Sequence, residues 1–251
     1  MKKKNKAIYL LFLMPFVYFA TACFVVWLVK TSGIYPSGSD TMYHVYRGDY
    51  VYNAIKSGNW YPLYDPAWYN GVEILRYWSP FPAYVMAFCQ YLAGGSQFGA
   101  YLFYIGGVCF LGACVWPFIG RGFNRPYLGA FIGLLWFFMP NNLCAIFIEG
   151  NLARSLSMIF LPVFIYSVYK YLYNHKLRYI PLMVFTFLLM ELCHLGYAGM
   201  VAIAVIIYGI VYMIQKGRKK AVLDVVISMI FGFMLLGIWL VASLRGGITS
   251  L

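Results

Sequence analysis

The feature that most limits the fold of this chain is a series of long apolar runs separated by short basic clusters. A bilayer-spanning helix needs about 20 mainly apolar residues. Only 10% of the 251 residues are charged, against roughly 25% in a soluble domain. The sequence therefore predicts an all-α polytopic membrane protein with about seven transmembrane helices. The expected spans are 7–29, 97–119, 127–146, 155–173, 180–194, 197–214 and 221–243.

The amino terminus, "MKKKNK" followed by an apolar run, is similar to a signal peptide. The run continues for about 23 residues, whereas the apolar region of a signal peptide has roughly 7–15. We therefore expect an uncleaved first span. The six cysteines lie mostly in apolar segments and form no CxxC pair, so neither a zinc site nor a disulfide framework is indicated.

The basic clusters predict the orientation in the membrane. The net charge is +12, and most of the basic residues lie in short clusters between apolar runs, which argues against a nucleic-acid partner. If the short segment 80–94 does not span and the N-terminus is cytoplasmic, 13 of the 19 Lys and Arg residues lie in cytoplasmic segments. If 80–94 spans, every later cluster moves outside, against the positive-inside rule. We therefore expect 80–94 to be interfacial or re-entrant, and loop 30–96 to be extracytoplasmic.

Nearly all acidic residues fall on the predicted outer face, and four of them share the loop. A loop this long is commonly functional. Only Asp224 is expected inside, where it would begin the last span, and Glu191 lies near the outer end of its span with His194. The outer acids are Asp40, Asp49, Asp65, Glu73 and Glu149.

A helix from about 40 to 56 is expected within the loop, because this stretch lacks Pro and ends at Gly58. On it Asp40, His44 and Arg47 have spacings of four and three residues, which put them on one face, with Asp49 opposite. An alternative explanation gives these three residues structural roles only. Asp40 would occupy the first turn, where the helix dipole stabilises an acid, and the other two would lie along an interfacial face.

The loop motifs, taken in order, resemble a known group. "SDTMYHVYR", "SGNWYPLYDPAWYNG" and "YWSPFPAYV" are similar to the class C (GT-C) membrane glycosyltransferases. The closest likeness is to the bacterial multi-pass family labelled "6-pyruvoyl-tetrahydropterin synthase related", a label that implies no pterin chemistry. The resemblance covers roughly residues 7–200 and is densest over 35–84. It implies a seven-span amino-terminal module over 1–251 with an interfacial helix at the Pro-x-Pro segment.

The resemblance also implies a reaction, in which a sugar passes from a polyprenyl-phosphate donor to an envelope glycopolymer or glycolipid acceptor on the outer face, with inversion. It implies Asp40, Glu149 and His44 as catalytic residues, with Asp40 as the base. The donor phosphate needs cations, and Arg47, Arg76 and Arg154 are the candidates. Candidate sugar or acceptor contacts are Trp60, Trp68, Asn70, Asn151 and His194, although membrane anchoring also explains aromatic residues.

Several alternatives stay open at this level. No cofactor is certain, and a divalent metal held by Asp40 and Glu149, with His44, is one option. The chain ends just after the seventh expected span, whereas most relatives continue, so two expectations stay open: the amino-terminal part of a longer protein, or a minimal member of the group. The competing functions are a transporter or lipid flippase, which predicts acids buried within spans, and a non-catalytic assembly subunit.

Overall fold

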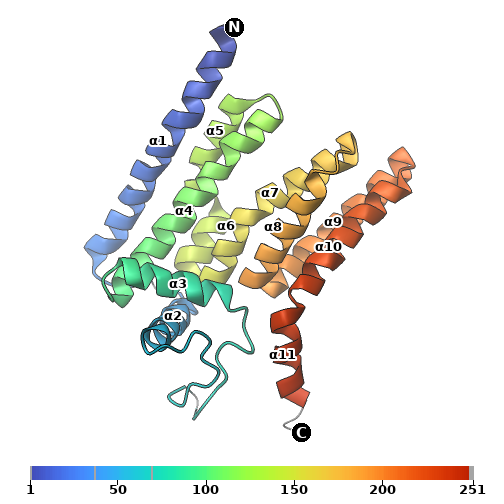
Figure 1. Ribbon diagram of the computed structural model, residues 1–251. Helices are drawn as coiled ribbons and strands as arrows, with labels where there is room; N and C mark the ends of the chain where they lie inside the picture. The colour runs from blue at the N-terminus through green and yellow to red at the C-terminus, as the bar shows by residue number, and fades with distance from the viewer. Residues whose placement is uncertain (1, 37, 69, 249–251) are drawn as a thin grey trace. The chain divides into compact units, whose positions relative to one another are not determined.

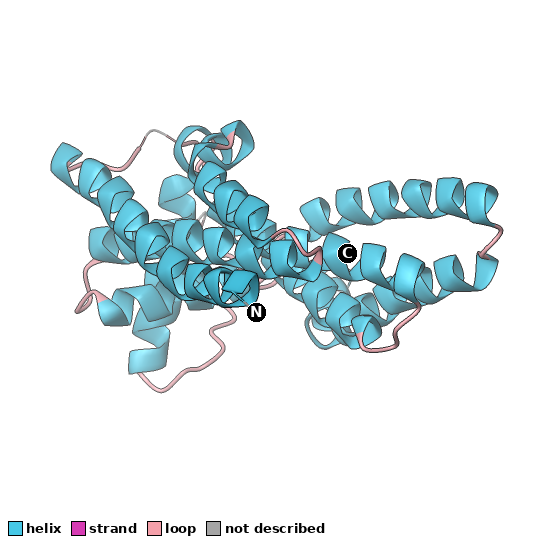
Figure 2. Cartoon of the chain, turned by 90° about the horizontal axis from the view of Figure 1, so that it is seen from above, coloured by secondary structure: helices cyan, strands magenta, loops and turns pink. Residues whose placement is uncertain are grey.

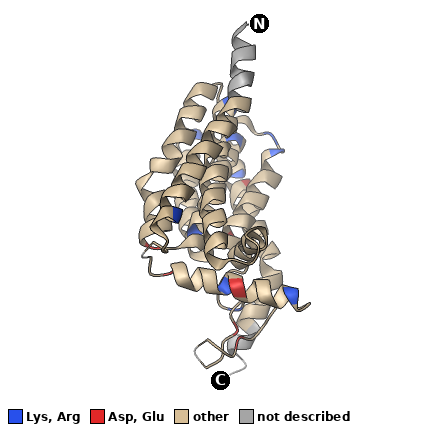
Figure 3. Ribbon diagram, turned by 90° about the vertical axis from the view of Figure 1, so that its left-hand side faces the viewer, with Lys and Arg blue, Asp and Glu red and all other residues tan. Residues whose placement is uncertain are grey.

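The computed structural model describes residues 2–36, 38–68 and 70–248 (Figure 1). These residues form helices and loops without a strand, as the cartoon in Figure 2 shows, apart from one isolated bridge between Asp65 and Val72. Charged residues are sparse, and Figure 3 shows long stretches of ribbon that carry none. The predicted all-α class is thus confirmed for the described residues.

The chain divides into two compact units: residues 1–62 with 81–159, and residues 63–80 with 160–251. We call these the N-terminal and C-terminal units. The helix from Leu152 to Asn174 begins in the first and continues into the second.

The N-terminal unit is built from long helices that lie side by side, with two shorter helices across one end (Figure 1). The short helix α3 packs against α2 and α4. The elements are α1 (Lys2–Ser32), α2 (Thr41–Lys56), α3 (Phe81–Leu92), α4 (Gln97–Gly122), α5 (Pro126–Leu135), η1 (Trp136–Phe138), α6 (Pro140–Leu143), η2 (Cys144–Ile148) and the start of α7 (Leu152–Asn174).

Small residues bring the long helices of this unit together. A Cβ added at Gly120 in α4 would lie 2.7 Å from the Cα of Gly129 in α5, so these backbones touch. The Tyr18 hydroxyl of α1 donates to the Ala130 carbonyl of α5 at 2.8 Å. Two further glycines, Gly112 and Gly133, allow close packing, because Trp136 and Tyr18 fill the space beside them.

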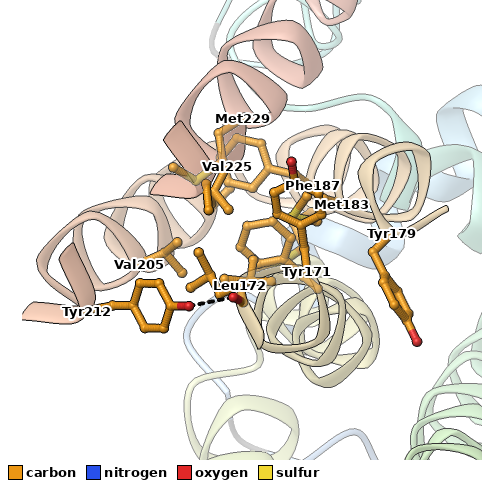
Figure 4. Close-up of a cluster of buried hydrophobic side chains, with 14 residues drawn as sticks. Tyr171, Leu172, Tyr179, Met183, Phe187, Val205, Tyr212, Val225 and Met229 are labelled. Atoms are coloured by element: carbon orange, nitrogen blue, oxygen red, sulfur yellow. Dashed lines mark hydrogen bonds between the residues drawn. The ribbon is translucent and has the colours of Figure 1, made fainter. Parts of the chain in front are cut away.

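The C-terminal unit contains the rest of α7, then α8 (Tyr179–Cys193), α9 (Leu195–Lys216), α10 (Lys219–Leu235) and α11 (Gly237–Ile248). Figure 4 shows its core, where Phe187 and Met183 of α8 meet Met229 of α10 beside Leu172 of α7. The Tyr212 hydroxyl of α9 donates to the Leu172 carbonyl.

The number of spans differs from the expected seven. Five described helical segments are long and apolar enough to cross a membrane: Phe12–Ser32, Gln97–Gly122, Pro126–Ile148, Leu152–Asn174 and Leu195–Lys216. The segment expected at 221–243 is bent by 59° at Leu236, so α10 and α11 form a broken span or a re-entrant pair.

The remaining expected span is short. Helix α8 has 15 residues, which gives it a length of about 22 Å against a hydrocarbon core of about 30 Å. The structure thus supports five or six spans by length and composition, and the seventh stays a prediction.

The long loop contains the two predicted short helices. Helix α2, at Thr41–Lys56, matches the expected helix from about 40 to 56. Helix α3 has 12 residues, about 18 Å, which is too short to cross a bilayer. This agrees with the expectation that 80–94 does not span.

Candidate functional site

The start of α2 lies directly against the turn that carries Glu149, both within the N-terminal unit. The Asp40 amide donates to the Glu149 carbonyl at 3.1 Å. The Ser39 hydroxyl lies 3.1 Å from the same carbonyl oxygen and 3.2 Å from Asp40 Oδ1, so it can donate to either acceptor. Two acidic residues expected in one site, from segments about 110 residues apart in sequence, are therefore neighbours in space.

Two glycines make this approach possible. A Cβ at Gly38 would lie 2.5 Å from the Cα of Gly150 and 2.6 Å from Thr41 Oγ1. Gly150 also has a φ of +68°, a conformation that disfavours other residues. The Thr41 hydroxyl is buried at the same crossing and has no hydrogen-bond partner within the described residues. The backbones of 38–41 and 149–150 are therefore in direct contact, with no room for side chains between them.

A distorted helical turn presents Glu149. The residues Cys144–Ile148 form a π-helical turn, and the Glu149 amide donates to the Cys144 carbonyl at 2.8 Å. The Cys144 thiol donates to Glu149 Oε1 at 3.3 Å. Single π turns occur often at functional sites, because they displace a side chain from the regular helical register.

Arg154 holds the other oxygen of this carboxylate. Its Nη1 lies 2.7 Å from Glu149 Oε2, and the two side chains are 19% and 37% exposed. Asn151 begins α7 by accepting a hydrogen bond from the Arg154 amide at 2.9 Å through Oδ1, the arrangement of a helix N-cap. The "EGNLAR" stretch thus folds into a turn that places the Glu149 carboxylate, the Arg154 guanidinium and the Asn151 side-chain amide close together.

Asp40 occupies a different position from the one expected. It is the N-cap residue just before α2 rather than part of the first turn, and its side chain makes no capping hydrogen bond. Its carboxylate instead lies within hydrogen-bond distance of the Ser39 hydroxyl. The carboxylate is therefore not committed to holding the helix start, and it sits partly exposed beside the Glu149 turn.

His44 and Arg47 follow Asp40 along α2 but are buried, with exposures of 8% and 1%. The Arg47 guanidinium lies over the ring of Tyr43, 5.4 Å from its centroid. Burial lowers the pKa of Arg47, and the nearby Tyr43 and Tyr104 phenols oppose this. At this depth Arg47 is part of the packing of α2, and its assignment to a donor phosphate stays a prediction.

Asp49 is separated from this group, as the helical spacing predicts. Its Oδ1 accepts a hydrogen bond from Gln90 Nε2 of α3 at 2.6 Å. Asp49 therefore joins α2 to α3.

The other predicted site residues are distributed over both units. In the N-terminal unit Trp60 is 71% exposed, and its carbonyl accepts from the Tyr84 hydroxyl at 2.7 Å. In the C-terminal unit the Trp68 carbonyl accepts from the Gly71 amide in a turn that contains Asn70, whose φ is +62°. Asn70 is exposed there.

Arg76 and His194 are engaged within the C-terminal unit. Arg76 pairs with Glu73, and its Nε donates to the Ser243 carbonyl of α11 at 3.2 Å. His194 caps α9, with Nδ1 accepting from the Tyr197 amide at 3.0 Å. Glu191 is 2% exposed and its Oε2 has no hydrogen-bond partner in the described part of the chain.

The metal option is not supported by the geometry. Within residues 2–36, 38–68 and 70–248 no group of three or more His, Cys, Asp and Glu side chains is arranged to hold a metal ion. Asp40, Glu149 and His44 therefore do not converge as a ligand set.

Sequence reasoning missed the residues that assemble the site. Ser39, Gly38, Thr41 and Cys144 join or support the two acidic segments, yet none was expected to do so. The one local signal was glycine, which directly follows Glu149 and lies two residues before Asp40.

These features define a multi-pass, all-α membrane protein with a polar cluster at one end of its N-terminal unit. Residues 75–251 match the family model described as "6-pyruvoyl-tetrahydropterin synthase related domain; membrane protein", and the chain belongs to this family. Glu149, Arg154 and His194 lie inside the matched region, whereas Asp40 precedes it. No curated protein and no solved structure matches the chain.

Proposed function

We propose that this protein is a GT-C membrane glycosyltransferase. It transfers a sugar from a polyprenyl-phosphate donor to an envelope glycopolymer or lipid acceptor at the extracytoplasmic face. The observation that carries the proposal is the contact of Asp40 with the Glu149 turn, through the 3.1 Å bond from the Asp40 amide to the Glu149 carbonyl. Asp40, the base in this proposal, thus lies beside the turn that carries the Glu149–Arg154 ion pair, within the N-terminal unit.

The chemistry assigned to Asp40 is general base catalysis. The acceptor hydroxyl loses its proton to the carboxylate as its oxygen bonds to the anomeric carbon of the sugar. The bond from that carbon to the phosphate oxygen breaks in the same step, and the polyprenyl phosphate leaves with the electron pair. A single displacement inverts the configuration at carbon. Ser39 can donate a hydrogen bond to Asp40 Oδ1, which would orient the carboxylate.

Arg154 supplies positive charge beside the acids. Its Nη1 already contacts Glu149 Oε2, and a guanidinium has further donors that can face a phosphate oxygen. In this proposal Glu149 positions Arg154, and Arg154 stabilises the charge that develops on the departing phosphate.

The experiment uses the full chain in nanodiscs with radiolabelled polyprenyl-phosphate hexose and envelope acceptors. Replacing Asp40 with Asn should reduce transfer by about 10²- to 10⁴-fold, because the base is lost while the shape is kept. Asp49→Asn is the matched control, since it lies on the same helix and its Oδ1 can still accept from Gln90. Undiminished transfer by Asp40→Asn would remove this residue as the base. Failure of every donor, with lipid binding intact, would favour a non-catalytic binding subunit.

A second candidate is a transporter or lipid flippase. It is favoured by the 59° break between α10 and α11 and by the buried Glu191 carboxylate, because transporters use broken helices and intramembrane acids. Movement of a labelled lipid across proteoliposome membranes, lost in Glu191→Gln and kept in Asp40→Asn, would support this candidate against glycosyl transfer.

A further inference from the structure

Helices α1, α3 and α4 of the N-terminal unit surround an open groove with a volume of about 880 Å³. Its walls are large apolar side chains, including Phe19 and Trp27 of α1, Phe88 of α3 and Leu111 of α4. Each of these four is more than half exposed, so the groove is not filled by the protein's own side chains. This apolar lining matches a long hydrocarbon chain. In a bilayer, such a chain binds in preference to ordinary lipid only if it fits the shape of the groove better than lipid tails do.

Lys30 gives the groove a polar end. It lies near the end of α1 and is the only charged residue in the lining formed by the described residues. A lysine ammonium is a compact positive charge that binds phosphate. An apolar groove with one cation at its end matches a ligand that has an apolar chain and an anionic head.

The other described basic residues expected on this side of the membrane do not line the groove. Arg47 is buried, and Arg76 and Arg154 are in ion pairs with acids. The Lys56 ammonium lies over the ring of Tyr52. Among the outer basic residues whose side chains are described, Lys30 is thus the one that lies on an apolar groove.

The groove and the candidate site share helix α7. Tyr104 lines the groove, and its hydroxyl donates to the Leu152 carbonyl at 2.9 Å. Leu152 begins α7, two residues after Gly150, and Leu156, one turn further along α7, also lines the groove. The helix that carries Arg154 therefore also supplies Leu156 to the groove wall.

We propose that this groove binds the polyprenyl chain of the lipid donor and that Lys30 binds its phosphate. This inference rests on the proposed function and assigns the phosphate to Lys30 in place of Arg47 and Arg76. The positive charge of Lys30 at the groove, together with the α7 wall that the groove shares with the candidate site, favours the donor lipid over a bilayer phospholipid.

The test measures binding rather than transfer. Radiolabelled undecaprenyl phosphate carrying a photoactivatable group is added to the purified full chain in nanodiscs, and covalent labelling is quantified. Gly107 lines the groove, and a Cβ there would meet no atom within 4 Å. Gly107→Leu therefore fills the groove without disturbing packing. Gly199→Leu is the matched control, because Gly199 is a helical glycine in α9 with equally open surroundings outside the groove.

Labelling should fall about tenfold in Gly107→Leu and remain unchanged in Gly199→Leu. Lys30→Gln should weaken labelling about tenfold, the size expected for one charge-assisted hydrogen bond, while Lys56→Gln should not. Unlabelled undecaprenyl phosphate should compete, and neutral undecaprenol should compete more weakly.

Three results would overturn the proposal. Labelling that survives Gly107→Leu would place the lipid elsewhere. Labelling that is insensitive to Lys30→Gln, with equal competition by undecaprenol, would indicate ordinary annular lipid. Equal competition by dioleoyl phosphatidate would make the groove a general anionic phospholipid site. If labelling behaves as expected and no sugar is transferred, the glycosyltransferase proposal fails while the lipid site stands.

Discussion

At the scale of single residues, the candidate site depends on a crossing of two backbones that admits no side chain. Gly38 and Gly150 touch, and the Thr41 hydroxyl lies against both of them. This crossing brings Asp40 to the Glu149 turn, where the Ser39 hydroxyl lies within reach of both residues. The geometry of the proposed base is therefore set by glycines rather than by other charged groups.

Gly150→Ala should disrupt this crossing. The added methyl would lie 2.6 Å from the Thr41 nitrogen, and the φ of +68° disfavours alanine. Together these should cost about 2–4 kcal/mol, which thermal unfolding in detergent would measure, and transfer should fall with it. Gly33→Ala is the control, because Gly33 has a φ of +69° with no atom within 4 Å of the added Cβ. Equal effects of both changes would mean that backbone strain alone, and not the crossing, matters.

The ion pair between Arg154 and Glu149 gives a second prediction at this scale. Arg154→Gln removes the positive charge from the cluster, and we expect transfer to fall about 10- to 100-fold, the range for loss of a charge-assisted contact. Arg154→Lys should recover only part of the activity, since lysine cannot contact two groups in a fixed plane. Arg121→Gln is the control. Arg121 lies in the last turn of α4, outside the cluster, so this change should leave transfer rates unchanged. Wild-type rates in Arg154→Gln would exclude a role for this cation.

At the scale of elements, helices α2 and α3 act as one packed pair. A Cβ at Gly48 of α2 would lie 2.6 Å from Cβ of Met86 of α3, so the helices are in close contact. Asp49 and Gln90 add a 2.6 Å hydrogen bond beside this contact. Because α3 also packs on α4, this pair fixes the position of α2 and hence of Asp40.

Gly48→Ala should therefore lower the stability of the N-terminal unit by about 1–3 kcal/mol through overpacking. Met86→Ala removes Cγ, the atom nearest to the new methyl, and keeps the Met86 Cβ. The double variant should consequently be less destabilised than the sum of the two single changes, which a thermal-unfolding double-mutant cycle would measure. Strict additivity would show that these two residues do not share the contact seen in the structure.

The type of helix also changes within one predicted span. The segment expected at 127–146 is a continuous apolar run in the sequence, but in the structure it passes from α5 through a 3₁₀ turn, α6 and a π turn. Pro140 lacks an amide hydrogen and starts a new helical segment. The consequence is that the run ends on the turn that presents Glu149 to Arg154.

At the scale of the whole molecule, the positions of lysine and arginine predict which loops face the cytoplasm. In a background with the natural cysteines replaced by alanine, Ser57→Cys and Gln97→Cys flank α3, and Leu177→Cys lies between α7 and α8. The predicted orientation keeps both ends of α3 outside and the basic loops inside. A membrane-impermeant maleimide should therefore label the first two in intact cells and the third only after permeabilisation. Labelling of Ser57→Cys and Gln97→Cys from opposite sides would mean that α3 crosses the membrane.

Local patterns predicted much of the fold. Proline-free and glycine-bounded sequence located α2, and charge asymmetry predicted that the segment containing the short helix α3 does not span. The prediction was less accurate where a helix is broken or short. Hydropathy sums over a window and cannot detect the bend at Leu236 or the limited length of α8. The sequence predicted which acidic residues belong to the candidate site, but not the contacts through Ser39, Gly38 and Gly150 that bring them together.

The sequence by itself determined that this protein is a multi-pass helical membrane protein, because a chain with so few charges and such long apolar runs can satisfy its backbone in lipid only as helices. It also singled out Asp40 and Glu149 as candidates. Only the tertiary structure decided that these residues meet, that Arg47 is buried and that Lys30 borders an apolar groove. Contacts between segments about 110 residues apart depend on how helices pack, and local sequence does not encode that packing.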